Sequence, residues 1–253
     1  MTTNRIRRAL LASAALALAS GLGLQAGAAS AAGWSKVRGS GRVVKVQRSV
    51  GGFSAVSLEL PATVDLIQGR IEGLTIETDD NLVDLIDTVV ERGVLRLRFK
   101  DRQVSVDSQG IRISLQARAL EALSIGGSGT LRASQWAGPK LGCALAGSGR
   151  FSFERLDTDS LVLSLSGSGD FKAAGRADSL EVRMAGSGDL RVPGLSARKA
   201  VLAMAGSGDA TVWARDSLTV NAAGSGDVAY YGDPVLVQSV LGSGTVRRLG
   251  AAP

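Results

Sequence analysis

A Gly-Ser-Gly triplet recurs at nearly even spacing through the second half of the chain, and it constrains the fold more than any other feature. The triplets follow one another at intervals of 20, 20, 19, 20, 18 and 18 residues and begin at Gly127, Gly147, Gly167, Gly186, Gly206, Gly224 and Gly242. Residues six, four and two places before the triplet are apolar in successive units, as at Leu161, Leu163 and Leu165. A period of two predicts a β-strand with one buried face.

A second strand follows each triplet, because the residues four and six places after its first glycine are also mostly apolar, as at Phe151 and Phe153. A unit of strand, tight corner, strand and looser connection is too short to bury its own apolar face. Stacked units can bury it if each strand pairs in parallel with its equivalent in the next coil, at about 4.8 Å. We therefore predict an all-β fold, a parallel β-solenoid. The alternative is a barrel of hairpins, whose connections would be alike, whereas here one corner is fixed and the other varies.

The first 32 residues have the order of a secretory signal. Basic residues at Arg5, Arg7 and Arg8 precede an apolar run over 9–19 and then small residues. The run is too short and wrongly flanked for a membrane span, so we predict a cleaved signal peptide over 1–32 and no membrane span in the mature protein. The adjacent arginines leave twin-arginine export open. We expect a protein exported to the periplasm or the cell surface.

The mature chain is expected to form one solenoid domain. We predict a linker over 33–45, the domain over 46–246 and a tail over 247–253; within the domain, 46–119 is less regular and 120–246 holds the triplet coils. The stretch 79–90 has apolar residues at a helix-like spacing, which also fits an irregular coil turn. Residues 95–99 and 111–115 alternate like strands and are expected as edge coils.

Composition excludes several kinds of chemistry. The chain has no histidine, which excludes a Ser-His-Asp triad and histidine-ligated zinc. Cys143 is the only cysteine and lies in an alternating apolar stretch, so we expect a buried, inert thiol and no internal disulfide. Without the three leader arginines, 26 basic residues face 23 acidic ones, a net charge of +3 with no basic cluster. This pattern argues against nucleic-acid binding, and no cofactor is expected.

Aspartate follows the triplet in four units, and in-register coils would place these residues in one column: Asp170, Asp189, Asp209 and Asp227. Carboxylate oxygens are ligands for Ca²⁺, so the column is a candidate cation site. One carboxylate per coil is sparse for that ion. In the structural alternative, each aspartate accepts an N–H of its own corner while the glycines adopt positive φ. The triplet serines are expected to form a hydrogen-bonding ladder. No lysine comes directly after a triplet and no helix begins there, which argues against a phosphate loop.

The outward positions of the strands before the triplets are small and uncharged, as at Ala144, Ser164 and Ala203, and only Glu181 and Arg183 interrupt them. Such a flat face suits packing against another layer. We expect that layer to be the 53–99 half of the same chain, with a second subunit as the alternative, which would make a homo-oligomer.

Solenoids also serve as polysaccharide-acting enzymes, which use acidic pairs or a basic residue beside a metal. Outward basic residues follow the corners at Arg132, Lys172 and Arg191, but no acidic partner is evident. The large aromatic residues that could stack on sugars fall at scattered offsets: Trp136, Trp213, Tyr230 and Tyr231. No catalytic or cofactor-binding residue is therefore predicted.

Three stretches carry a resemblance to a known family: "GGFSAVSLELPATVDLIQG" at 51–69, "DNLVDLIDTVVERGVLRLRF" at 80–99 and "LEALSIGGSGTL" at 120–131, followed by the GSGD turns. Together they resemble the bacterial family called putative auto-transporter adhesin, head GIN domain. The chain departs from its pattern at Thr130, Arg150 and Thr245, where aspartate is expected.

The resemblance implies an exported protein with a β-solenoid-like fold, a role in adhesion or at the cell envelope, and no catalytic residues. We expect a non-enzymatic module that binds an unknown glycan or protein ligand. A polysaccharide-acting enzyme and a Ca²⁺-binding surface repeat are the alternatives.

Overall fold

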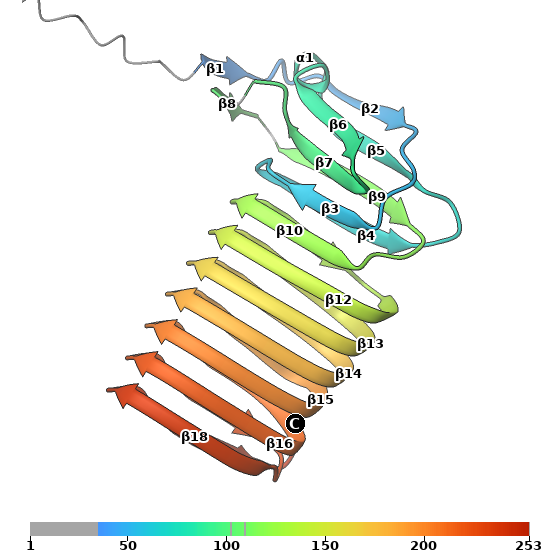
Figure 1. Cartoon of the computed structure of the whole chain (residues 1–253). Helices are drawn as coiled ribbons and strands as arrows, with labels where there is room; N and C mark the ends of the chain where they lie inside the picture. Colours follow the sequence, from blue (N-terminus) through green and yellow to red (C-terminus); the bar gives the residue numbers. More distant parts are fainter. Residues whose placement is uncertain (1–34, 102, 109, 253) are drawn as a thin grey trace, which may run out of the picture. The chain divides into compact units, whose positions relative to one another are not determined.

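The computed structural model describes residues 35–101, 103–108 and 110–252 (Figure 1). The predicted signal peptide lies outside these residues. The described part is almost entirely β-structure. Its elements up to the first triplet are β1 (Ser35–Arg38), β2 (Val43–Arg48), β3 (Ala55–Leu58), β4 (Ala62–Gln68), β5 (Gly73–Asp79), α1 (Asp80–Val83), β6 (Ile86–Glu91), β7 (Val94–Phe99), β8 (Val104–Asp107), β9 (Ile111–Ala117) and β10 (Ala122–Gly127).

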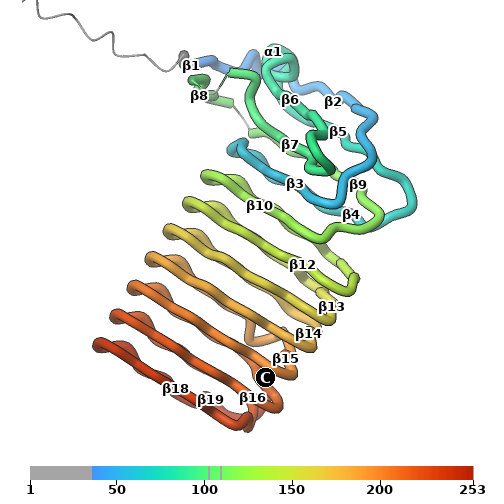
Figure 2. The backbone as a smooth tube through the Cα atoms, viewed as in Figure 1, coloured from blue at the N-terminus to red at the C-terminus, as the bar shows by residue number. Residues whose placement is uncertain are grey.

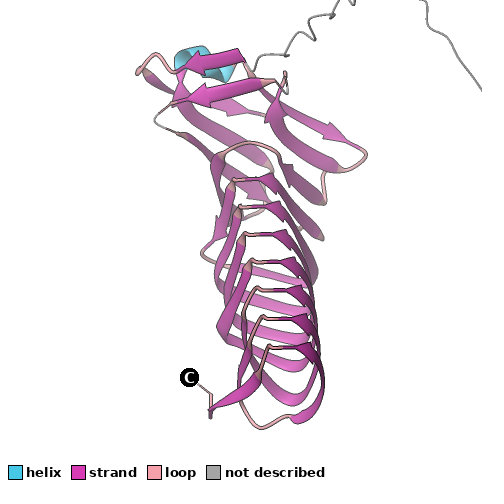
Figure 3. Ribbon diagram, turned by 90° about the vertical axis from the view of Figure 1, so that its left-hand side faces the viewer, coloured by secondary structure: helices cyan, strands magenta, loops and turns pink. Residues whose placement is uncertain are grey.

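The triplet half consists of longer strands that each follow most of one coil. They are β11 (Thr130–Ala133), β12 (Trp136–Gly147), β13 (Arg150–Gly167), β14 (Asp170–Gly186), β15 (Asp189–Gly206), β16 (Ala210–Gly224), β17 (Val228–Tyr231), β18 (Val235–Gly242) and β19 (Val246–Gly250). Consecutive coils pair in parallel, with Gly147 opposite Gly167 and Gly167 opposite Gly186. Figures 1 and 2 show these coils stacked one on another, and Figure 3 shows the sharp triplet corners aligned along the stack. The predicted parallel β-solenoid is confirmed, and the hairpin-barrel alternative is wrong because hairpins would pair antiparallel.

The core lies inside the coils, where the inward positions of successive strands form continuous apolar columns. The column four places before the triplet is buried throughout β10 to β16: Leu123, Cys143, Leu163, Val182, Leu202 and Val220. On the strands after the corner, Phe151 and Phe153 of β13 pack on Phe171 of β14, with ring centroids 5.8 Å apart in both pairs. Each coil therefore depends on its neighbours to bury its apolar side chains.

The coil stack continues into the first half of the chain. Strands β3 and β4 pair in parallel with β10 and β11, and β7 and β9 pair in parallel with β3 and β4. The expected edge coils at 95–99 and 111–115 are thus present, within β7 and β9. Beyond them the pairing becomes antiparallel, between β2 and β5, β5 and β9, and β6 and β7. We call the elements β1, β2, β5, α1, β6 and β8 the cap.

The helix-like spacing over 79–90 gives only a one-turn helix, α1, followed by the strand β6. The β-branched residues Thr88, Val89 and Val90 favour the strand. Arg92 and Gly93 have φ values of 53° and 78° and form the turn that returns the chain as β7. The helical interpretation was therefore wrong for most of this stretch, because a hairpin partner outweighs the local spacing.

Two ranges expected outside the domain contain strands. Within the predicted linker, β1 pairs with β8 and β2 begins its pairing with β5. Within the predicted tail, β19 pairs with β17. Both ranges gain backbone hydrogen bonds from partners far away in the sequence, which local composition does not reveal. The exact domain boundaries stay predictions.

Candidate functional site

The glycines of the triplets are required by the stacking of the coils. The first glycine has positive φ, as at Gly186 with φ 122°, and the second lies against the backbone of the preceding coil. A Cβ atom on Gly188 would overlap the carbonyl oxygen of Gly169. The backbone N–H of Ser187 donates to the carbonyl of Gly167 at 2.9 Å, so the serine ladder is built by main-chain groups. The triplet is thus accounted for without a ligand.

The aspartates that follow the triplets do form a column, and each carboxylate from Asp189 onward bonds to the next coil. Asp209 N–H donates to Oδ1 of Asp189 at 3.2 Å, and Asp227 N–H donates to Oδ1 of Asp209 at 2.9 Å. Oδ1 of Asp227 accepts from both N–H and Oγ1–H of Thr245, each at 2.8 Å. The expected bond to the residue's own corner is replaced by an inter-coil bond, because the next coil brings a backbone N–H directly over the carboxylate.

Arginines neutralise the first two members of the column. Arg150, which stands where the family pattern has aspartate, pairs with Asp170 at 2.9 Å. Arg191 pairs with Asp189 and lies 3.6 Å from Asp170. At the other end, the Thr245 hydrogen bonds hold the pKa of Asp227 below its ordinary value. The column is therefore a set of partnered anions on an exposed edge.

Asp170, Asp189, Asp209 and Asp227 stay candidates for a cation row, since no observation tests them directly. Within the part of the chain that the structure describes, no group of three or more histidine, cysteine, aspartate or glutamate side chains could hold a metal ion. The hydrogen bonds and arginine pairs described above compete with any cation for the carboxylate oxygens.

The strands before the triplets present the broad face of small residues. Its outward positions lie in β12 to β16 and β18. They form three columns, which hold the residues one, three and five places before the first glycine of each triplet. The middle column is exposed throughout: Ala144, Ser164, Arg183, Ala203, Asn221 and Ser239. We call these three columns the flat face. The expectation that the 53–99 half covers this face was wrong, because β3 and β4 extend the sheet at its end and do not lie over it.

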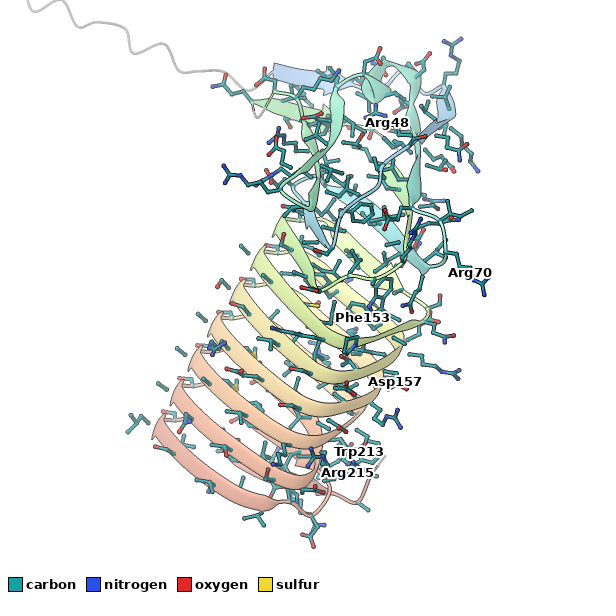
Figure 4. The ribbon with its side chains drawn as sticks, turned by 45° about the vertical axis from the view of Figure 1, so that its right-hand side comes forward. Arg48, Arg70, Phe153, Asp157, Trp213 and Arg215 are labelled. Atoms are coloured by element: carbon teal, nitrogen blue, oxygen red, sulfur yellow. The ribbon has the colours of Figure 1, made fainter. Side chains whose placement is uncertain are left out.

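Two of the three outward basic residues on the strands after the triplets, Arg132 and Arg191, form ion pairs. Arg132 pairs with Asp65, and this contact raises the pKa of the guanidinium. Arg191 pairs with the aspartate column, as described. The large aromatic residues do not gather: Trp136 and Tyr230 are buried, whereas Trp213 and Tyr231 are half-buried. Figure 4 shows Trp213 and Arg215 near the free end of the stack, far from Arg48 in the cap.

Cys143 lies in the core, as expected, and is buried. Desolvation raises the pKa of its thiol far above the ordinary value, so the reactive thiolate is disfavoured.

Two features were not foreseen from the sequence. Inter-coil ion pairs line the looser edge of the stack, where Asp157 pairs with Arg176 at 2.9 Å and Arg198 lies 4.0 Å from both Asp178 and Asp216. A groove of about 630 Å³ lies beside the cap and is lined by Glu59, Pro61, Arg98, Phe99 and 104–106. Its walls come from three separate parts of the chain, so no local motif marks it.

A family model described as "Putative auto-transporter adhesin, head GIN domain" matches residues 52–234. The chain belongs to this head GIN domain family. The resemblance carried by 51–69, 80–99 and 120–131 is thereby confirmed. A search of curated proteins finds no match to this head GIN domain chain.

Solved structures share the fold of this head GIN domain protein. A putative lipid binding protein from Parabacteroides distasonis is 26% identical, with a TM-score of 0.70, and the match covers 85% of this chain and 100% of that one. A putative adhesin from Bacteroides fragilis is 23% identical, with a TM-score of 0.77 and coverage of 84% and 100%. A putative adhesin from Parabacteroides merdae is 20% identical, with a TM-score of 0.67 and coverage of 85% and 99%.

Proposed function

We propose that the protein is an exported, non-enzymatic adhesin-like module of the cell envelope that binds a glycan or protein ligand on its flat face. Family membership and the names of two structural neighbours support an adhesin-like role. None of the helices among the described residues is long and apolar enough to cross a membrane. The observation that carries the proposal is the exposure of the flat face over six neighbouring strands of one sheet, β12 to β16 and β18.

The flat face suits adhesion for a physical reason. Alanine, glycine and serine side chains lose little or no rotamer entropy when a ligand covers them, and they let a ligand approach the sheet closely. Ala144, Ala203 and Ser239 lie in one column of this kind, and the only charges on the face belong to Glu181 and Arg183, which pair with each other. Adhesion thus requires a ligand with a flat, weakly polar surface.

Binding to peptidoglycan sacculi and to collagen-coated beads tests the proposal. We expect the purified protein to be depleted from solution by at least one of these surfaces. Ala203→Arg places a long charged side chain on the flat face and should abolish this depletion. Thr211→Arg is the matched control. Thr211 lies outward on the strand after the triplet, on the other side of the coil from Ala203, so this variant should bind like the wild type. Equal loss in both variants, or no depletion by either surface, would contradict the proposal.

The polysaccharide-acting alternative predicts a different result in the same experiment. An enzyme of that class would release soluble sugar with new reducing ends from the sacculi, whereas an adhesin would only bind. A second subunit on the flat face is the other alternative. It predicts that Ala203→Arg changes the mass of the protein in solution as well as its binding.

A further inference from the structure

The two ends of the coil stack are built differently. At one end, β10 and β11 are paired with β3 and β4, and the cap follows. At the other end, β18 pairs with β16 and β19 pairs with β17, and within the described residues neither has a partner on its second side (Figure 1). An unpaired strand edge offers a row of N–H and C=O groups to another chain. The end formed by β18 is therefore an open edge.

Strand β18 lacks the usual protection of an edge. Its sequence, VLVQSVLG, contains no charged residue and no proline. Its outward apolar side chains are strongly exposed: Val235 and Leu241 at 72% and Val237 at 60%. Natural edges are normally blocked by lysine, proline or inward-pointing charges. By contrast, β19 carries Arg247 and Arg248, so the exposed apolar edge belongs to β18.

The coil geometry shows which backbone groups of β18 are free. In earlier coils, Gly142 N–H donates back to Glu121 O and Ser148 N–H donates back to Gly127 O. Gly142 lies five places before the first glycine of its triplet, and Ser148 lies one place after it. Residues at such odd distances thus point their N–H groups to the preceding coil. Residues at even distances point their N–H groups to the following coil. In β18, Leu236, Gln238 and Val240 consequently direct their N–H and C=O groups out of the stack.

Gln238 interrupts an otherwise apolar column. It lies opposite Val220, in the column that holds Cys143, Leu163 and Leu202 in the core, but it is exposed. The polar amide falls in the middle of the eight-residue strand, with Leu236 and Val240 two places to either side.

We propose that β18 pairs antiparallel with β18 of a second copy of this chain, about a two-fold axis at Gln238. In this register the backbone groups of the two Gln238 residues bond to each other, and Leu236 lies opposite Val240 of the second copy. On the outward side, Val235 meets Leu241 and Val237 meets Ser239 of the second copy. The strand is complementary to itself, in both hydrogen bonding and apolar pairing, and has no charge to repel its equivalent.

A second copy suits this edge because the opposite end of the stack is closed. The pairing of β10 and β11 with β3 and β4 leaves no free triplet coil at that end for head-to-tail stacking, so the equivalent edge of a second copy is the matching partner for β18. A two-fold contact of this kind closes on itself and gives a dimer, not a fibre.

Sedimentation velocity of the purified protein over a range of concentrations tests the proposal. We expect a monomer–dimer equilibrium in the wild type. Gln238→Lys places like charges on both sides of the axis and should weaken the dimer at least about tenfold. Ser239→Lys, with the same charge on the adjacent outward position, is the matched control and should weaken it less. Circular dichroism and thermal unfolding show whether both variants remain folded.

A cysteine at the axis gives an independent readout. Opposed residues in a hydrogen-bonded antiparallel pair lie about 5.5 Å apart at Cα, within disulfide range. Oxidised Gln238→Cys should therefore form a covalent dimer, whereas the wild type, with only the buried Cys143, should not. A wild-type protein that stays monomeric at every concentration overturns the proposal. A dimer that Gln238→Lys leaves intact overturns it as well, because its interface must then lie elsewhere.

Discussion

The second glycine of each triplet is constrained by contact between coils and not by its own φ. Gly188 and Gly208 lie over the carbonyl oxygens of Gly169 and Gly188, where any Cβ atom would overlap the backbone. The backbone cannot move away without breaking the parallel pairing on both sides of the corner. The serine between the glycines is exposed and has no such constraint.

Gly188→Ala should therefore destabilise the protein, by about 3 kcal/mol, through overpacking at the corner. Ser187→Ala, one residue earlier, should change the free energy of unfolding by less than about 0.5 kcal/mol, as is usual for a surface substitution. Urea unfolding followed by circular dichroism measures both values. Similar stability in the two variants would show that the corner can open to admit a methyl group.

Asp227 provides a residue-level test in acid. The hydrogen bonds from Thr245 hold its pKa below the ordinary value of 3.8. Because the folded pKa lies below the unfolded one, the ionised carboxylate stabilises the folded state above pH 3.8. This contribution is lost as the pH falls through the lowered folded pKa.

Thr245→Val removes the Oγ1 donor and leaves the N–H donor, so we expect the pKa of Asp227 to rise toward 3.8. Carbon NMR titration of the carboxyl group measures it. Thr75→Val, in the cap strand β5, serves as the control and should leave the Asp227 titration unchanged. A pKa that stays low in Thr245→Val would show that the hydroxyl is not the cause.

The aspartate column is a property of the stacked elements. Each of its later carboxylates accepts an N–H from the following coil, and Arg150 and Arg191 neutralise the first two. The ion pairs at the looser edge, such as Asp157 with Arg176, are exposed and contribute little to stability individually. Both features tie neighbouring coils together at the surface.

Calcium tests whether the column also holds a cation. Because the carboxylate oxygens are already partnered, we expect excess Ca²⁺ to leave the melting temperature of the wild type unchanged. Binding to the folded state alone would raise it. A rise that disappears in Asp209→Asn would instead establish the cation row. A rise that persists in this variant would place the Ca²⁺ elsewhere.

Across the whole described region, stability is shared among repeated coils. From β12 to β16, the strand register places each triplet beside the triplet of the preceding coil. Each coil packs its apolar side chains on its two neighbouring coils. In repeat proteins of this kind, the free energy of unfolding is approximately the sum of the intrinsic stability of each coil and the stability of each interface between neighbouring coils. Removing one complete coil should therefore preserve the fold.

Deletion of residues 168–186, which joins Gly167 to Ser187, removes one complete coil and retains the triplet. We expect a folded β-protein that unfolds at a lower urea concentration than the wild type. Deletion of 177–186 removes ten residues, including the strand before one corner, and should abolish cooperative unfolding. Two equally stable deletion products would argue against a register fixed by the triplets.

The triplet period predicted the coil stack, but the first half of the chain was harder to infer. Residues 95–99 and 111–115 alternate clearly enough to be assigned as edge coils. The stretch 79–90 was misleading because its apolar spacing fits a helix, whereas its backbone pairs as a hairpin with β7. For the candidate site, the aspartate column and the small outward residues were visible in the sequence, but their hydrogen-bond partners and exposure were not.

The sequence by itself determined the solenoid, because a period of about twenty residues with two strands and a glycine corner has few other ways to bury its apolar face. It also determined the family and the positions of the glycines. Only the tertiary structure decided that β3, β4, β7 and β9 extend the stack and leave the flat face exposed, that the carboxylates bond to the next coil, and that β18 ends as an open edge. These three outcomes depend on which strand lies beside which, and pairing between distant residues leaves no local period in a sequence.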